Sequence, residues 1–193
     1  MIVPLWEKTK YRPGKRWPIY LDPRGTFGSG AHETTRLIVR LMEKLDGRFS
    51  SFLDIGMGSG ILSVAAWRLG AQTLWGFDCD GNSVKTARVN LLANQCKVAQ
   101  FFQSDIARFS CRKQFDLVGA NLDTNLLRRY KNKITASVRL NQYLIISGIL
   151  ARNFREIRPE FRDAPLRCLK ILKSRGWISA FYQRVKSSTN KTR

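Results

Sequence analysis

Short apolar runs and stretches of helical periodicity alternate along most of the chain. After a glycine-rich loop over residues 24–30, apolar side chains recur on one face of a helix that ends at Gly47: Leu37, Ile38, Leu41, Met42 and Leu45. Short apolar runs then predict strands over residues 52–55, 73–77, 98–102, 115–120 and 143–146. The periodic stretches around them predict helices over residues 61–69, 83–94, 125–138 and 151–161. Two late runs, residues 166–172 and 177–185, are expected to form an antiparallel pair at one edge.

This alternation predicts an α/β fold. Because the strands are short, apolar and separated by helices, we expect a Rossmann-like, doubly wound, seven-stranded and mostly parallel sheet with an antiparallel edge strand. The domain is expected to span residues 25–186. Residues 1–24 form a basic aromatic N-terminal arm without regular structure, and the polar tail, residues 187–193, is expected to be disordered.

A glycine loop follows the first predicted strand of the sheet. That strand ends in Asp54, and Gly56, Gly58 and Gly60 come before the next helix. Glycines let the backbone turn tightly and let a ligand lie against it. Since open parallel sheets bind ligands beyond the carboxyl ends of their strands, we expect this loop to hold a cofactor.

Two further acids favour S-adenosylmethionine as that cofactor. Asp78 ends the second strand and is placed to accept hydrogen bonds from both ribose hydroxyls, and Asp105, after the third strand, can reach an adenine amino group. A dinucleotide loop would have its third glycine where Ile61 stands, and the phosphate-binding GxxxxGK[ST] pattern is absent. The alternative is a catalytically inactive relic of the fold.

The charge of the chain is strongly positive. A formal net charge of +20 and a pI near 10.6 attract polyanions, above all RNA or ribosomal particles, although such cations also simply keep a surface solvated. In the arm, lysines and arginines are interleaved with aromatic residues: Trp6, Tyr11, Trp17 and Tyr20. This pattern suits RNA stacking, but we favour rings packed on the domain with their charges in water.

The cysteines and the chain ends indicate a cytoplasmic protein. Four scattered cysteines show no metal-type spacing, so we expect neither a metal site nor a disulfide framework, with Cys79 and Cys168 in the core. No apolar stretch approaches the roughly 20 residues that span a bilayer, and the first residues are too short for a signal peptide. We therefore expect no membrane partner.

The sequence resembles the ribosomal protein L11 methyltransferases over residues 18–184. The matching blocks are Leu21-Asp22-Pro23, residues 27–35 (FGSGAHETT), residues 53–62 (LDIGMGSGIL), Ala120-Asn121-Leu122 and residues 147–150 (SGIL). The resemblance concerns the catalytic domain only. Where the family carries a separate N-terminal domain that captures the ribosomal protein, this sequence has the basic arm.

The resemblance implies a class I, S-adenosylmethionine-dependent methyltransferase that acts on protein amines, on a lysine side chain or an α-amine. By position, the family's cofactor contacts fall on Thr35, Gly56, Asp78 and Asn121. Asn121 would orient the acceptor amine through its side-chain oxygen, and the carbonyl of Leu122 would accept a second amine proton. The alternative for Asn121 is a helix N-cap.

Two other polar residues lie near these positions. His32 is the only histidine of the chain, and we expect it to shape the loop or to face solvent rather than to act as a base. Asp123 is a candidate for handling protons or attracting a cationic amine, but we favour a role in stabilising the dipole of the following helix from its first turn. The cations Arg128, Arg129, Lys131 and Lys133 lie near the predicted mouth of the site and suit either an anionic substrate or a solvated helix face.

Two other functions stay open at this point. The net charge suits an RNA methyltransferase acting on rRNA or tRNA, but residues 121–124 offer no aromatic ring to stack a target base. A non-catalytic, basic RNA- or ribosome-binding module with a relic methyltransferase fold is the other alternative. The leading hypothesis remains a protein N-methyltransferase whose partner is a protein, such as a ribosomal one.

Overall fold

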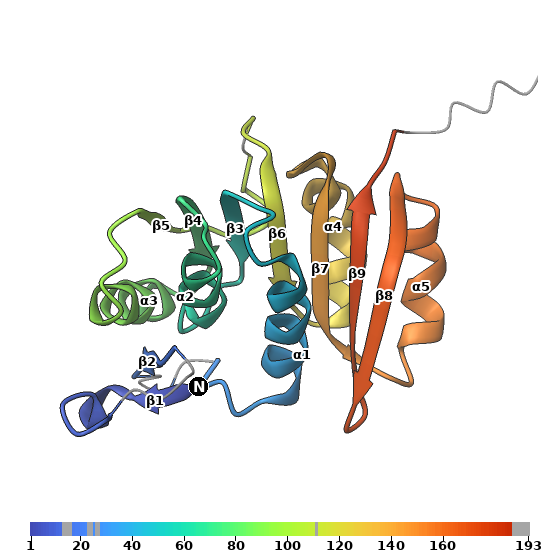
Figure 1. Ribbon diagram of the computed structural model, residues 1–193. Helices are drawn as coiled ribbons and strands as arrows, with labels where there is room; N and C mark the ends of the chain where they lie inside the picture. Colours follow the sequence, from blue (N-terminus) through green and yellow to red (C-terminus); the bar gives the residue numbers. More distant parts are fainter. Residues whose placement is uncertain (13–16, 23–24, 26–27, 111, 187–193) are drawn as a thin grey trace, which may run out of the picture.

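The computed structural model describes residues 1–12, 17–22, 25, 28–110 and 112–186, and over these residues the main sheet has seven strands (Figure 1). Their order in space is β5-β4-β3-β6-β7-β9-β8. The bounds are β3 Ser51–Ile55, β4 Thr73–Asp78, β5 Ala99–Gln103, β6 Phe115–Asn121, β7 Val138–Leu150, β8 Leu166–Ser174 and β9 Trp177–Arg184. Neighbours are parallel except that β9 runs antiparallel to β7 and to the edge strand β8. The predicted sheet is thus confirmed, and the predicted disorder of residues 187–193 lies outside the described residues.

Helices cover both faces of the sheet (Figure 1). The helices are α1 Glu33–Met42, α2 Ile61–Arg68, α3 Gly81–Ala93, α4 Thr124–Ala136 and α5 Phe154–Arg162, with a short 3₁₀ turn, η2 Glu43–Leu45, after α1. The first three helices share one apolar core, and α4 and α5 share the core on the opposite face. In β3, Phe52 belongs to the first core and Leu53 to the second, and both are fully buried. The central strands therefore read as continuous apolar runs rather than alternating ones.

Some element bounds differ from the prediction for local reasons. Helix α3 begins at Gly81 because the Asp80 side chain accepts hydrogen bonds from the backbone nitrogens of Asn82 and Ser83, at 3.1 and 3.0 Å. Strand β7 is 13 residues long, far longer than the predicted 143–146, and it passes an irregularity in its pairing with β6 between Phe115 and Leu117. Side chains near its start are exposed, so the apolar pattern revealed only its buried half.

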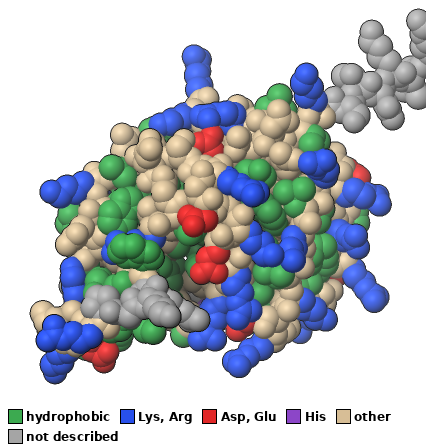
Figure 2. Space-filling view, viewed as in Figure 1, with side chains coloured by type: hydrophobic (Ala, Val, Ile, Leu, Met, Phe, Trp, Pro, Cys, Tyr) green, Lys and Arg blue, Asp and Glu red, His purple; other side chains and the backbone are tan. Residues whose placement is uncertain are grey.

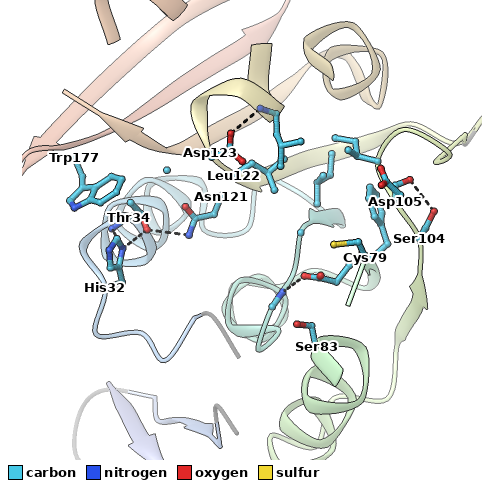
Figure 3. A pocket seen from close by; sticks show the side chains of 18 residues that line it. His32, Thr34, Cys79, Ser83, Ser104, Asp105, Asn121, Leu122, Asp123 and Trp177 are labelled. Atoms are coloured by element: carbon cyan, nitrogen blue, oxygen red, sulfur yellow. Dashed lines mark hydrogen bonds between the residues drawn. The ribbon is translucent and has the colours of Figure 1, made fainter. Parts of the chain in front are cut away.

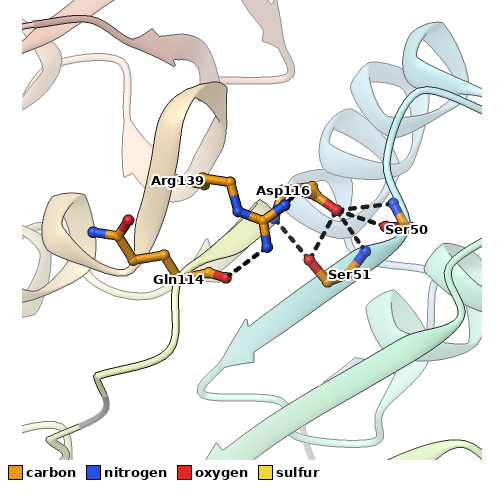
Figure 4. A network of polar contacts seen from close by, with 5 residues as sticks. All are labelled: Ser50, Ser51, Gln114, Asp116 and Arg139. Atoms are coloured by element: carbon orange, nitrogen blue, oxygen red, sulfur yellow. Dashed lines mark hydrogen bonds and ion pairs between the residues drawn. The ribbon is translucent and has the colours of Figure 1, made fainter.

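A polar network joins β3 and β6 at their amino ends (Figure 4). One carboxylate oxygen of Asp116 accepts hydrogen bonds from the backbone and hydroxyl groups of both Ser50 and Ser51, at 2.9 to 3.1 Å. The other oxygen pairs with Arg139, which also reaches the Gln114 carbonyl. Burial alone would raise the pKa of Asp116, but the serine hydrogen bonds and Arg139 outweigh it and lower that pKa. The network fixes the sheet at the edge opposite the strands' carboxyl ends.

The arm is more regular than the sequence predicted. Strands β1 (Ile2–Pro4) and β2 (Ile19–Leu21) form a small parallel sheet, and a 3₁₀ turn, η1 (Leu5–Glu7), follows β1. The side chain of Asn94 bonds both the N–H and the carbonyl of Tyr20, and Asn90 does the same for Asp22. The side-chain amides of Asn90 and Asn94, at the end of α3, therefore supply backbone hydrogen bonds that β2 does not obtain from a second neighbouring strand. Hydrophobic periodicity in the sequence does not predict such contacts.

The aromatic residues of the arm divide into two groups. Tyr11 and Tyr20 pack edge to face, with ring centroids 6.4 Å apart, as expected for rings covering the domain. Trp6 and Trp17 are instead 67% and 74% exposed, although the guanidinium of Arg68 of α2 lies over the Trp17 ring at 5.7 Å. The packing prediction is therefore wrong for Trp6, and Trp17 contacts the domain by one face only.

The cysteine prediction also needs correction. Cys79 and Cys168 are exposed rather than buried in the core, whereas Cys96 is buried, and these three thiols are free. Cys79 directly follows β4, where the chain leaves the sheet, and Cys168 lies on the edge strand β8. Within the described ranges, no helix is long and apolar enough to span a bilayer.

Candidate active site

A cavity of about 510 Å³ opens at the carboxyl ends of the parallel strands (Figure 3). Residues from the ends of β3, β4, β5 and β6 line it, together with the start of α1 and the start of β9. This is the edge at which a doubly wound sheet binds its ligands. Six residues predicted for the site lie on the cavity wall: Gly56, Gly58, Asp78, Asp105, Asn121 and Leu122.

The glycine loop wraps around the end of β3. Gly56, Gly58 and Gly60 all have positive φ, at 69°, 51° and 77°. Residues that carry a Cβ rarely adopt this backbone conformation. The Gly58 nitrogen donates to a carboxylate oxygen of Asp78 at 2.9 Å, so the acid from β4 holds the loop in place. A Cβ on Gly60 would lie 2.9 Å from the Cβ of Ala87, which explains the third glycine by helix packing rather than by ligand contact.

Asp54 lies behind the cavity rather than on its wall. Its carboxylate is fully buried and accepts hydrogen bonds from the backbone nitrogen and hydroxyl of Ser63, at 3.1 and 2.7 Å. The second oxygen has no hydrogen-bond partner among the described residues. Desolvation raises the pKa of Asp54 to about 7. The residue ties β3 to α2 and carries a charge only at neutral pH and above.

A chain of hydrogen bonds orients the carboxamide of Asn121 (Figure 3). The backbone nitrogen of Thr34 donates to Nδ1 of His32 at 3.4 Å, so Nδ1 carries no proton. The Thr34 hydroxyl, 2.8 Å from the same Nδ1, must therefore be the donor there. Its oxygen then accepts from Asn121 Nδ2 at 3.2 Å.

The same assignment of donors and acceptors determines which atom of Asn121 is available to a ligand. Because Nδ2 is used on Thr34, Oδ1 is the remaining polar atom, and it is buried with no hydrogen-bond partner among the described residues. A buried, unpaired amide oxygen costs free energy unless a ligand supplies a donor. Asn121 is not an N-cap, because Asp123 caps α4 through bonds to Asn125 and Leu126.

Leu122 is held tightly between two strands. A Cβ added to Gly56 would lie 2.5 Å from the Leu122 Cδ2, and a Cβ added to Gly148 would lie 2.1 Å from the Leu122 carbonyl oxygen. The Leu122 backbone nitrogen donates to the Ser147 carbonyl at 3.2 Å. Only glycine at position 148 permits this close approach, so the matching SGIL block has a physical role at the site.

The outer wall contains residues that the sequence did not single out. The ring of Trp177 packs edge to face on His32, with centroids 5.0 Å apart, and both line the cavity. Thr34 lines it too, whereas the predicted Thr35 is buried beneath the helix with its hydroxyl unpartnered among the described residues. For two adjacent threonines at a helix start, the sequence does not show which one faces the cavity. Trp177 was missed because it lies far along the sequence from the other residues of the site.

Three predicted cofactor contacts are therefore not on the cavity wall: Thr35, Asp54 and Gly60. Thr35 and Asp54 directly follow or precede a wall residue in the chain, and Gly60 packs against α3. The arrangement as a whole places a carboxylate, a glycine loop and an unpaired amide oxygen around one enclosed space. It suits a cationic or hydroxyl-bearing ligand next to a hydrogen-bond donor.

Comparison with known proteins agrees with this geometry. The family model described as ribosomal protein L11 methyltransferase (PrmA) matches residues 1–185. Among curated proteins, the ribosomal protein L11 methyltransferase of Geobacter metallireducens is 37% identical over 183 residues, covering 95% of this chain and 60% of that protein. The one from Caldanaerobacter subterraneus is 31% identical, covering 93% and 57%. This chain thus spans about three fifths of the length of these relatives.

Solved structures give the same result. The crystal structure of the ribosomal protein L11 methylase from Lactobacillus delbrueckii superposes with a TM-score of 0.87 at 26% identity, covering 95% of this chain and 94% of that one. The N-methyltransferase NodS from Bradyrhizobium japonicum, in complex with S-adenosyl-L-homocysteine, shares the fold at a TM-score of 0.65 and 16% identity. By sequence and by structure, the chain belongs to the ribosomal protein L11 methyltransferase family.

Proposed function

We propose that the chain is an S-adenosylmethionine-dependent methyltransferase that transfers methyl groups to protein amines, with ribosomal protein L11 as the acceptor. Family membership supports the reaction, and the family's description names the acceptor. The observation that carries the proposal is the buried Asn121 Oδ1, which lacks a donor among the described residues and lies at the cofactor edge of the sheet. A ribosomal acceptor also implies a cytoplasmic location.

The residues of the cavity fit the cofactor. The Asp78 carboxylate, already fixed by Gly58, is suited to ribose hydroxyls, and Asp105 on the neighbouring strand end is suited to an adenine amino group. Gly56 and Gly58 adopt positive φ on the cavity wall, a backbone conformation that suits glycine and brings the main chain of the loop next to the cavity. S-adenosylmethionine supplies an electrophilic methyl group on a sulfonium.

The protein's own task is to hold a neutral amine in line and to exclude water. Asn121 Oδ1 accepts one amine proton, and the Leu122 carbonyl accepts another, so the amine nitrogen keeps a defined direction. Trp177 and His32 close the outer wall and reduce the hydration of the amine, which favours its uncharged form. The site needs no strong general base, because the entering ammonium gives up one proton to solvent water before transfer and the methylated product leaves as an ammonium ion.

The structure gives one observation in favour of a nucleic-acid acceptor. Trp177 places an aromatic ring at the cavity, which residues 121–124 alone do not provide. A ring there can stack a base as well as cover an amine. The assay below therefore includes rRNA as a second acceptor.

Calorimetry with S-adenosylmethionine tests the cofactor site. We expect micromolar binding by the wild type, loss of at least tenfold in affinity for Asp78→Ala, and no binding of NAD. Asp46→Ala, which removes an exposed acid beyond α1, is the matched control and should bind normally. A folded protein that does not bind S-adenosylmethionine, or that binds it equally well without Asp78, would contradict the proposal.

Transfer of a labelled methyl group tests the acceptor. We expect label on ribosomal protein L11 and none on rRNA, and a loss of about a hundredfold in turnover for Asn121→Ala with cofactor affinity kept. Label on rRNA alone would replace the protein acceptor by a nucleic acid. Label on neither acceptor, from a protein that binds the cofactor, would refute both.

A further inference from the structure

A stripe of cations runs along the exposed side of α1. Arg36, Arg40 and Lys44 are all exposed and follow one another at intervals of four residues, about 6 Å per step along the helix. Helix α1 packs against β9 and β8, and from β8 the side chain of Lys170 meets that of Lys44. We call these residues, with Arg175 in the turn after β8, the α1–β8 stripe. In Figure 2, Lys and Arg side chains gather over α1 and toward the β9–β8 side.

The cations of the stripe outnumber the acids beside them. Arg36 pairs with the buried Glu33 at 4.0 Å, and a hydrogen bond with Ser174, together with Arg175, Arg36 and Arg40, lowers the pKa of Glu33. Contact with Lys170 lowers the pKa of Lys44, as expected for two neighbouring ammonium groups. Counted against Glu33 and the exposed Glu43 and Asp46, the five cations leave the stripe with a net positive charge.

Some cations on the opposite face of the sheet have acidic partners. Arg128 and Lys131 of α4 pair with Glu160 of α5 at 2.6 and 3.6 Å, and Arg162 pairs with Asp163 at 3.4 Å. Of the other two cations that the sequence placed near the mouth, Arg129 lies over the ring of Tyr130 and Lys133 bonds backbone carbonyls.

The stripe begins at the cavity. Thr34, on the cavity wall, is two residues before Arg36, and Trp177, on the same wall, is two residues after Arg175. From this mouth the cations continue along α1 and into η2, where Lys44 lies. A linear anion lying on them would have one end next to the place where the methyl acceptor enters.

We propose that the α1–β8 stripe binds the phosphate backbone of an RNA strand and holds it beside the mouth of the cavity. A row of evenly spaced, exposed cations matches a polymer with one negative charge per nucleotide, and binding releases the counterions of both. Arginine forms bidentate bonds to phosphate oxygens, which adds geometry to the charge. The stripe would let the protein bind an acceptor that is itself attached to RNA. Its role is independent of the methyl-transfer chemistry.

Fluorescence anisotropy with a labelled oligouridine strand of about 20 nucleotides tests the proposal. The stripe variant is Arg36→Gln/Arg40→Gln/Lys44→Gln. The control is Arg155→Gln/Arg158→Gln/Arg162→Gln, which removes the same charge from exposed positions of α5. Between about 50 and about 300 mM salt, loss of three phosphate contacts should reduce the slope of log K against log salt by about two.

We expect the stripe variant to lose at least tenfold in RNA affinity near 100 mM salt, while the α5 variant stays within about threefold of the wild type. Equal losses in the two variants would assign RNA binding to the overall charge and overturn the proposal. Polyglutamate that competes as well as RNA per unit charge would point to an acidic protein and overturn it too. Cofactor binding by each variant, measured alongside, shows that it is folded and separates this result from the proposed function.

Discussion

The carboxamide nitrogen of Asn121 donates to the hydroxyl of Thr34 across 3.2 Å, and this contact ties the end of β6 to the first turn of α1. The two residues are 87 positions apart. Because Thr34 donates its only hydroxyl proton to His32, its oxygen can only accept from Asn121, so that Thr34 and His32 together fix which way the Asn121 amide is turned. The site therefore depends on a residue that makes no contact with the acceptor in the proposed mechanism.

Thr34→Val removes that hydroxyl and keeps the shape of the side chain. We expect kcat to fall by about tenfold to a hundredfold, because the amide is then free to turn, and the affinity for S-adenosylmethionine to stay within about twofold. Thr34→Ser should restore most of kcat. Steady-state kinetics with calorimetry checks both.

Thr135→Val is the matched control for this substitution, since the Thr135 hydroxyl is also buried but has no hydrogen-bond partner among the described residues. It should keep full activity. If Thr34→Val and Thr34→Ser lose turnover equally, or if the control loses as much, Thr34 does not position Asn121.

Asp54 should make the fold less stable as the pH rises. Its folded-state pKa of about 7 lies above the ordinary value of 3.8, so the folded state holds a proton that the unfolded state has lost. Stability from this group is complete below about pH 4 and declines as the pH rises through 7. The difference between the two pKa values corresponds to a loss of unfolding free energy on the order of 4 kcal/mol.

Asp54→Asn isolates this effect. The amide oxygen can accept from Ser63, and the amide NH₂ takes the place of the oxygen that has no partner among the described residues. In thermal unfolding at a series of pH values, the variant should gain stability relative to the wild type between pH 4 and pH 7. Parallel curves for the two proteins would show that Asp54 does not titrate in this range.

The Asp116 network should matter for stability and not for the cofactor. Asp116→Ala leaves the buried donors of Ser51 without their acceptor and removes that of the exposed Ser50 and the partner of Arg139, which costs on the order of 3 kcal/mol, or about 6–12 °C in Tm. Calorimetry below the new Tm should find unchanged affinity for S-adenosylmethionine, because the network lies at the amino ends of the strands. Weakened binding by the folded variant would mean that the two edges of the sheet are coupled.

Gly148→Ala should disrupt the acceptor side of the site. The new Cβ would lie 2.1 Å from the Leu122 carbonyl oxygen, so that the carbonyl must move, and turnover should fall more than tenfold. Gly70→Ala is the control, because Gly70 also has a positive φ, of 98°, but a Cβ there meets nothing within 4 Å. It should cost only about 1 kcal/mol of stability, from backbone strain. Equal turnover in the two variants would remove Leu122 from the mechanism.

The strands of the central sheet were predictable because they are buried on both faces. In β3 and β6 most buried positions are apolar, with Asp54 and Asp116 among the exceptions, so the runs at 52–55 and 115–120 stand out, and the glycine loop and Asp78 follow from them. Strand β7 was predicted short, because its first residues are exposed and leave no apolar signal.

The rest of the site depends on contacts that a sequence pattern does not encode. Whether Thr34 or Thr35 faces the cavity is decided by the pitch of α1 and by the His32 cap, and Trp177 comes from the last strand of the sheet. The small β1–β2 sheet exists because Asn90 and Asn94 supply hydrogen bonds to the backbone of residues 20 and 22. None of these features alters the hydrophobic periodicity on which the prediction depended.

The position of Gly148 against Leu122 has a consequence for how this enzyme family can diversify. The groups proposed to handle the amine are fixed by backbone packing between adjacent strands, and few substitutions there are tolerated. The outer wall is different, because Trp177 directly follows the tight turn of Arg175 and Gly176, whose glycine has open space around it. A change in the length of that turn would therefore move Trp177 on the outer wall, while the backbone contact between Gly148 and Leu122 stays intact.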